Sequence, residues 1–279
     1  LVTPILSLGQ VEILETKAVY VLDSEGLLID LYTQREPYSG KGANQPSDAF
    51  APEEEVILYG YVSYNLAPVP NEIVAFEIQG PPNPLNNITL SGTATTNASG
   101  IATTNFRIPW PTENPEIIVF GEWTVHATIE IAERVSEDTL TFKVGWIIEI
   151  LSLITINKDL QRQTKFPKGT RVGIEIALRN IALIAKNTTI VVGAYDSLEH
   201  TFDLVTLSDF EIEPGETYAY CFLQIPEWVT TGDASAYANA YTASGVACCP
   251  QVSTTFVITP LGDANGDEVV DMKDIYIVI

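Results

Sequence analysis

Few side chains in this sequence could move a proton or attack a substrate at neutral pH. The two histidines, His126 and His200, are the natural candidates for acid–base catalysis, because imidazole titrates near neutrality. Neither histidine neighbours a nucleophile-elbow or zinc-binding motif. The alternation around His126 turns it outward from a predicted strand, and His200 follows Glu199 in a turn. We therefore predict structural roles for both histidines and no enzymatic activity.

Other residues whose side chains could act in catalysis or phosphate binding do not lie in a motif for either function. The run from Glu53 to Glu55 stands at the entrance of a predicted strand, as a solvated rim does. Gly40, Lys41 and Gly42 lie in a loop without the strand and helix that a phosphate-binding loop requires. Nothing singles out two of the many carboxylates as a glycosidase pair.

The net charge of the chain limits the classes of partner that it can bind. With 36 acidic and 14 basic residues, the formal net charge is -22. Such a field repels phosphate backbones and anionic lipids, so we expect no nucleic-acid or peripheral membrane binding. The excess of carboxylates suits cations, and calcium (Ca2+) is the expected cofactor. The sequence begins at Leu1 and has no apolar run of membrane-spanning length, which we interpret as a processed mature chain without membrane insertion.

If the protein is exported, its cysteines and sequons could carry covalent modifications. Outside the cell, Cys221 could form a disulfide with Cys248 or Cys249; the alternative is three buried or half-buried thiols. The sequons that would accept N-linked glycans begin at Asn87, Asn97 and Asn187. Chance occurrence of the sequons is an equal alternative.

The elements that carry these residues are short β-prone runs separated by turns, and no stretch keeps a helical period. We predict strands at 11–22, 27–32, 56–64, 73–78, 88–95, 101–108, 117–131, 138–144, 147–156, 171–179, 188–195, 202–207, 217–223, 234–242 and 252–259. This pattern predicts an all-β fold of two tandem immunoglobulin-like sandwiches, residues 1–145 and 146–260, followed by a terminal segment, 261–279. The long polar loop at 35–52 is expected to be functional or mobile.

Four stretches of the first half carry a family resemblance: 92–97, 100–102, 106–109 and 120–125. They resemble macroglobulin-like and invasin-like immunoglobulin domains. Within the last of them, Trp123 is expected to anchor the core, and Gly121 to let the backbone bend into the strand.

In the second half, a further resemblance is carried by residues 178–180, 213–215, 225–228 and Gly232. These residues resemble the cell-adhesion-related domains found in tandem on prokaryotic surface proteins. Together the two resemblances cover most of the chain and imply no catalytic residue. They imply a prokaryotic, and more specifically archaeal, surface protein.

Residues 263–274 resemble the calcium loop of one half of a dockerin, which is itself similar to an EF-hand loop. The resemblance implies the ligands Asp263, Asn265, Asp267, the carbonyl of Val269, Asp271 and Asp274. The alternative is a solvated acidic tail. Glu268 replaces the usual glycine, and a full dockerin has two such loops, so cohesin binding does not follow.

We hypothesise from these features an extracellular structural protein, a self-associating subunit of a cell-surface filament, stalk or S-layer. The apolar termini, Leu1–Leu8 and Ile275–Ile279, are candidates for strands exchanged between subunits, although Ile275–Ile279 could equally begin a helix. One alternative is an adhesin or dockerin-type binding module of a carbohydrate-active assembly, which an exposed row of Trp228, Tyr237 and Tyr241 would favour. Another is a pair of accessory domains of a larger secreted enzyme.

Overall fold

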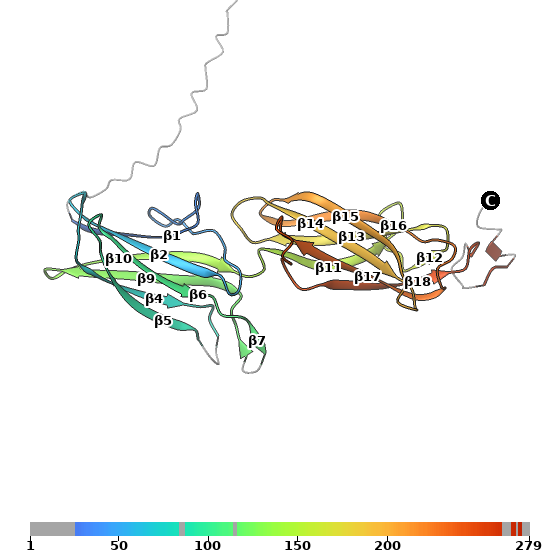
Figure 1. Ribbon diagram of the computed structural model, residues 1–279, viewed down its shortest axis with the longest axis horizontal. Helices are drawn as coiled ribbons and strands as arrows, with labels where there is room; N and C mark the ends of the chain where they lie inside the picture. The colour runs from blue at the N-terminus through green and yellow to red at the C-terminus, as the bar shows by residue number, and fades with distance from the viewer. Residues whose placement is uncertain (1–25, 84–86, 114–115, 264–268, 272, 275–279) are drawn as a thin grey trace, which may run out of the picture.

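The protein is an elongated, all-β molecule in which two sandwiches follow one another along the long axis (Figure 1). The computed structural model describes residues 26–83, 87–113, 116–263, 269–271 and 273–274. The predicted strand at 11–22 and the terminal segments 1–8 and 275–279 lie outside the described residues. Within the described ranges no helix is long and apolar enough to cross a membrane.

The first sandwich is built from two antiparallel sheets. One sheet comprises β1 (Leu27–Thr33), β2 (Glu55–Tyr64), β3 (Ala67–Pro68) and β6 (Ile101–Arg107), with β1, β3 and β6 all pairing with β2. The other has the order β10 (Arg134–Val144), β9 (Gly121–Ile131), β4 (Ile73–Gln79) and β5 (Thr89–Thr95). A small hairpin of β7 (Thr112–Glu113) and β8 (Glu116–Ile117) projects near the junction (Figure 1).

The core of the first sandwich is rich in rings. Strands such as β2 and β4 alternate buried apolar and more exposed residues, because successive side chains of a strand point to opposite faces. The Trp123 ring is fully buried and stacks on Phe106 and Phe142 at centroid distances of 5.9 and 6.3 Å. Its Nε1 donates a hydrogen bond of 2.8 Å to the Val119 carbonyl. Trp123 is therefore the core anchor that was predicted.

The second sandwich pairs a sheet of three strands with a sheet of five. The first has the order β11 (Ile148–Ile156), β13 (Arg171–Asn180) and β16 (Gly215–Gln224). The second has the order β12 (Lys165–Pro167), β18 (Val252–Thr259), β17 (Gly232–Tyr241), β14 (Lys186–Tyr195) and β15 (Thr201–Ile212). Only the β12–β18 pair of these described strands is parallel.

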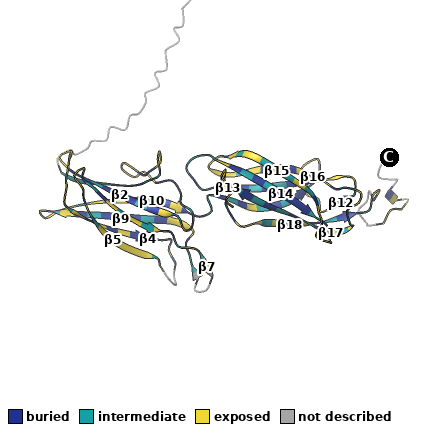
Figure 2. Cartoon of the chain, viewed as in Figure 1, coloured by how far each residue is buried: buried dark blue, intermediate teal, exposed yellow. Residues whose placement is uncertain are grey.

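The core of the second sandwich is aliphatic. The inward face of β17 consists of alanines, Ala234, Ala236, Ala238 and Ala240, all buried. Val192 from the neighbouring strand β14 and Ile174 from the facing sheet are among the residues that complete the same cluster. Figure 2 shows the buried residues as dark bands inside both sandwiches.

The strand predictions agree with the described strands except in detail. The predicted run 117–131 is interrupted, because β8 ends at Ile117 and β9 begins at Gly121. Gly121 has a φ of 143°, a conformation that favours glycine, and a Cβ there would lie 3.0 Å from Pro81. The short strands β3, β7 and β12 were not predicted, because two or three residues carry too little periodicity.

The loop at 35–52 is held against the first sandwich. The Ser47 and Phe50 backbone nitrogens donate hydrogen bonds of 2.9 Å to the carbonyls of Thr141 and Lys143 on β10. The hydroxyls of Thr33 and Ser47 lie 2.6 Å apart. These contacts anchor the loop on β10, and the expectation that it is functional or mobile stays a prediction.

Candidate functional sites

Asp48 joins the two sandwiches. This carboxylate is 5% exposed and lies in the 35–52 loop of the first sandwich. Its Oδ1 accepts a hydrogen bond of 2.7 Å from the Leu183 backbone nitrogen, and its Oδ2 lies 3.3 Å from Lys186 Nζ. Both partners belong to the second sandwich. A buried carboxylate that accepts a charged and a backbone hydrogen bond fixes its partners in one geometry.

Aromatic rings pack around the linker at the same junction. Trp146 follows the last strand of the first sandwich and meets Trp110 and Phe120 edge-on, at centroid distances of 5.5 and 5.3 Å. Trp146 also packs against the core of the second sandwich. The Gly145 nitrogen donates to the Phe50 carbonyl, which ties the linker to the loop. Both polar and apolar contacts therefore hold the two sandwiches together.

Part of the proposed calcium loop is described by the structure. Asp263 and Asp274, the first and last ligand positions, are 1% and 4% exposed. Val269 is exposed, as is Asp271. Asn265 and Asp267 lie outside the described residues, and among those described no group of three or more His, Cys, Asp or Glu residues converges.

Local hydrogen bonds shape the end of this loop. The Asp271 nitrogen donates a bond of 2.8 Å to Asp274 Oδ2, and the Asp274 nitrogen donates to the Asp271 carbonyl at 3.2 Å. Lys273 Nζ lies 3.4 Å from Asp271 Oδ2. Two carboxylates withdrawn from water at the ends of the loop fit a hard cation, because calcium takes oxygen ligands. The ligand set as a whole stays a prediction.

The three sequon asparagines are on the surface. Asn87, Asn97 and Asn187 are all exposed. Asn97 Oδ1 accepts hydrogen bonds from the Ser99 and Ile101 nitrogens in a tight turn, and Asn187 faces outward on β14. Each position is therefore accessible to a glycan, whose presence stays a prediction.

The cysteines are free thiols in this structure. Cys221 and Cys249 are buried in the second core and Cys248 is half-buried, which corresponds to the alternative without a disulfide. Burial, with a smaller contribution from Asp203, raises the pKa of the Cys221 thiol to about 11. Cys249 Sγ accepts a hydrogen bond of 3.4 Å from the Ile150 nitrogen.

The histidines occupy the outer surface. His126 faces outward on β9, as predicted, and its Nδ1 lies 3.0 Å from Thr139 Oγ1. Glu77 stands opposite His126 in the strand register, but its carboxylate accepts a hydrogen bond from Gln79. His200 Nδ1 lies 3.6 Å from Asp196 Oδ2, in the turn between β14 and β15. These contacts orient side chains on open surfaces.

The glutamates at the strand entrance have partners that the sequence did not predict. Glu54 Oε1 lies 2.5 Å from Arg35 Nη2, and Glu54 Oε2 accepts from the Ala51 nitrogen. Glu55 Oε1 accepts from Asn105 Nδ2. The contacts of Glu54 hold the 35–52 loop at the start of β2, and that of Glu55 joins β2 to β6, so the rim is not purely solvated as was expected.

Of the three aromatic residues that would favour a binding module, Tyr237 and Tyr241 are half-buried on β17 and Trp228 is exposed. Trp228 lies in the loop between β16 and β17, and Tyr237 is half-buried edge-on against Tyr195 at 5.5 Å. A different row exists: Tyr218, Tyr220 and Phe222 alternate along β16 and are 53%, 43% and 38% exposed. The alternation of β16 in the sequence is the signal that would have found this row.

No family model and no curated protein matches the chain. Among solved structures, Escherichia coli α2-macroglobulin activated by porcine elastase aligns with 14% identity and a TM-score of 0.37, over 85% of this chain and 22% of that one. Salmonella α2-macroglobulin reacted with methylamine aligns with 13% identity and a TM-score of 0.35, over 85% and 17%. A DUF4785 family protein from Legionella pneumophila aligns with 8% identity and a TM-score of 0.33, over 82% and 56%.

The chain thus spans less than a quarter of the macroglobulin chains it matches. Likenesses at these TM-scores carry no argument about activity or partners. The immunoglobulin-like architecture rests on the sheets described above.

Proposed function

We propose that this chain is a non-catalytic, extracellular structural protein, a stiff two-domain unit of a cell-surface filament, stalk or S-layer. The observation that carries the proposal is the junction, where Asp48 reaches from the first sandwich to Leu183 and Lys186 of the second. A flexible tether needs no buried hydrogen bond of this kind. A unit that transmits force along an assembly does, because bending at the junction would dissipate that force.

Exposed sequons and carboxylates support a location outside the cell. Glycans on Asn87, Asn97 and Asn187 would cover a surface that faces the environment. Calcium at the C-terminal loop, between Asp263 and Asp274, would offset part of the negative charge at that end of the molecule. The partner in this proposal is a second copy of the chain, joined by the apolar terminal segments Leu1–Leu8 or Ile275–Ile279.

The stiffness of the unit can be measured directly. In nitrogen-15 relaxation experiments, both sandwiches of the intact chain should show one rotational correlation time. The double variant Asp48→Ala/Trp110→Ala should give two shorter ones, while the matched control Asp159→Ala, an exposed aspartate far from the junction, should not. Two different correlation times in the unmodified chain would contradict the proposal.

Assembly and calcium need separate experiments. Electron microscopy should show ordered polymers or sheets of the full chain, and deletion of the terminal segments should stop assembly without unfolding the monomer. Normal polymers from both truncated chains would exclude strand exchange.

Titration with terbium, a luminescent calcium substitute, should saturate one site that Asp263→Asn/Asp274→Asn removes.

A further inference from the structure

Positive charge is concentrated in one segment of this acidic protein. Residues 157–171 contain five of the 14 lysines and arginines and one of the 36 acidic residues. The cations of this segment are Lys158, Arg162, Lys165, Lys168 and Arg171. The segment runs from the end of β11 through β12 to the start of β13, at the end of the second sandwich that lies away from the junction (Figure 1).

The cations are available to a ligand. Lys158, Arg162 and Arg171 are exposed and Lys168 is half-buried. Within the described part of the chain no ion pair involves these four side chains, and Arg171 Nε only donates to Gln224 Oε1 at 3.3 Å. The segment also contains one carboxylate, Asp159, so that its net charge is positive and its surface attracts anions.

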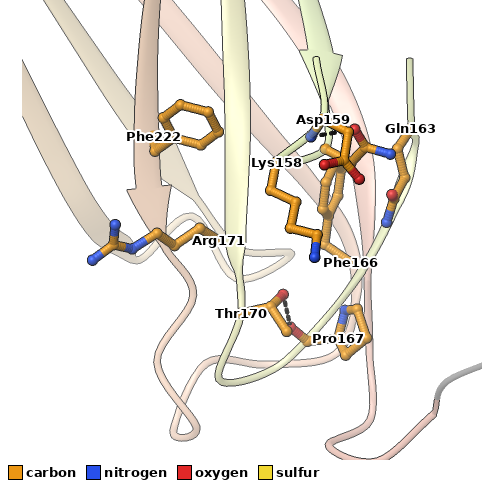
Figure 3. A pocket seen from close by; sticks show the side chains of 9 residues that line it. Lys158, Asp159, Gln163, Phe166, Pro167, Thr170, Arg171 and Phe222 are labelled. Atoms are coloured by element: carbon orange, nitrogen blue, oxygen red, sulfur yellow. Dashed lines mark hydrogen bonds between the residues drawn. The ribbon is translucent and has the colours of Figure 1, made fainter. Parts of the chain in front are cut away.

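A pocket of about 470 Å3 opens inside this surface. Its lining includes the cations Lys158 and Arg171, the carboxylate of Asp159, the amides of Asn157 and Gln163, and the ring of Phe222. Figure 3 shows Phe222 and Arg171 on one side of the pocket and Lys158 and Gln163 on the other. A volume of this size, with rings and a few polar groups, suits a small ligand or one unit of a polymer better than a flat protein surface.

The pocket continues into the aromatic row on β16. Phe222 belongs to both, and Tyr220 and Tyr218 extend the row over about 14 Å of strand at ~3.4 Å per residue. Across the sheet, small residues flank the row: Gly173 stands opposite Phe222 and Ala177 opposite Tyr218. Ring faces beside small side chains remain open for stacking.

Polar groups border the same row. Glu175 stands opposite Tyr220, and contact with the sheet surface together with this carboxylate raises the pKa of the Tyr220 hydroxyl. Glu216 stands opposite Arg179, which pairs with Glu149. The row is therefore aromatic with polar edges, which is the chemistry that recognises sugar rings, whose C–H faces stack and whose hydroxyls accept and donate hydrogen bonds.

We propose that this end of the second sandwich binds an acidic polysaccharide, a chain of sugar rings that carry carboxylates. The rings stack on Tyr218, Tyr220 and Phe222, and a carboxylate enters the pocket between Lys158 and Arg171. Arginine and lysine are the side chains that pair with carboxylates. An anionic ligand is attracted to this basic segment and repelled by the acidic remainder of the protein surface. The site is independent of the proposed structural function, since it needs no assembly.

Binding of fluorescent polygalacturonate to the full, monomeric chain tests the proposal. The measurement is made at 0.1 M salt, where a Debye length of about 10 Å screens the distant carboxylates of the protein. Saturable binding is expected. Its methyl-esterified form, which lacks the charge, and polyglutamate, which lacks the rings, should each bind at least about tenfold more weakly, the equivalent of ~1.4 kcal/mol.

Matched variants assign the binding to the two parts of the site. Lys158→Gln/Arg171→Gln and Tyr218→Ala/Tyr220→Ala, all at exposed positions, should each weaken polygalacturonate binding about tenfold or more. The controls Lys41→Gln and Tyr64→Ala, an exposed cation and an exposed ring of the first sandwich, should leave it unchanged. The proposal is overturned by absent binding, by equal binding of polyglutamate, or by tyrosine variants that bind normally. Weakening by the controls would overturn it as well.

Discussion

The first sandwich fills the space between its sheets with rings, whereas the second fills it with alanines and branched aliphatic residues. In the first, the rings of Trp123, Phe106 and Phe142 all pack against one another. In the second, the small side chains of Ala236 and the other buried alanines on β17 allow the facing sheet to approach closely. The two cores should therefore respond differently to substitution. A loss of side-chain volume should destabilise the first core, and a gain of side-chain volume should destabilise the second.

The largest test of this comparison is Trp123→Ala. Removing a fully buried indole and its hydrogen bond to Val119 should lower the free energy of unfolding of the first sandwich by about 3 to 5 kcal/mol. Calorimetry should show the transition of the first sandwich at lower temperature, with the second little changed. Trp228→Ala, at a ring that is 65% exposed, is the control and should change stability very little. Equal shifts of both transitions would show that the two cores do not unfold separately.

Ionisation of the thiols affects the stability of the second sandwich alone, because all three cysteines belong to it. Burial raises the pKa of Cys221 from 9.0 to about 11, so the unfolded thiol ionises before the folded one. The contribution of this thiol to the free energy of unfolding is fully present below pH 9. It falls by about 2 to 3 kcal/mol as the pH rises through 11. Denaturant titrations of the unmodified chain and of Cys221→Ala should diverge in this window, and parallel curves would argue against the raised pKa.

A gain of volume should harm the second sandwich. Ala236→Leu inserts three carbons into a fully buried position and should cost about 1 to 3 kcal/mol. Asn239→Leu places the same side chain on the outer face of β17 and is the matched control. Chemical unfolding monitored by the reactivity of the cysteines reports this sandwich selectively. A larger penalty for the control than for Ala236→Leu would mean that the alanine face is not tightly packed.

Calcium should give the smallest effect, again confined to the second sandwich. If the loop after β18 binds the ion only when folded, calcium at ten times its dissociation constant stabilises the chain by about 1.4 kcal/mol. The melting transition of the second sandwich should then rise with calcium and fall with chelator, and Asp263→Asn should abolish the response. A rise in the transition of the first sandwich instead would place the ion elsewhere.

Much of the fold follows from local pattern. The alternation of β2, β4, β9 and β17 is visible in the sequence because each strand buries one face, and the runs that predict these strands overlap them. Trp123 was identified as a core anchor from its large ring and from the resemblance of the stretch 120–125 to other immunoglobulin-like domains. The outward position of His126 also follows from the alternation of its strand.

Tertiary structure alone decided the sites. Asp48 lies 135 residues from Leu183 in the chain, and nothing in its local sequence indicates that a loop carboxylate would bind the next domain. The basic segment 157–171 and the tyrosines of β16 are also distant in sequence. They meet because Arg171 begins the strand that pairs with β16.

The sequence by itself determined that this protein is all-β, acidic and divided into units of sandwich size, since composition and alternation are local properties. Which carboxylate bridges the units, which rings form a row and which cations border a pocket depended on strand register. Register is a long-range property, because it is chosen by the packing of two sheets and not by either strand alone.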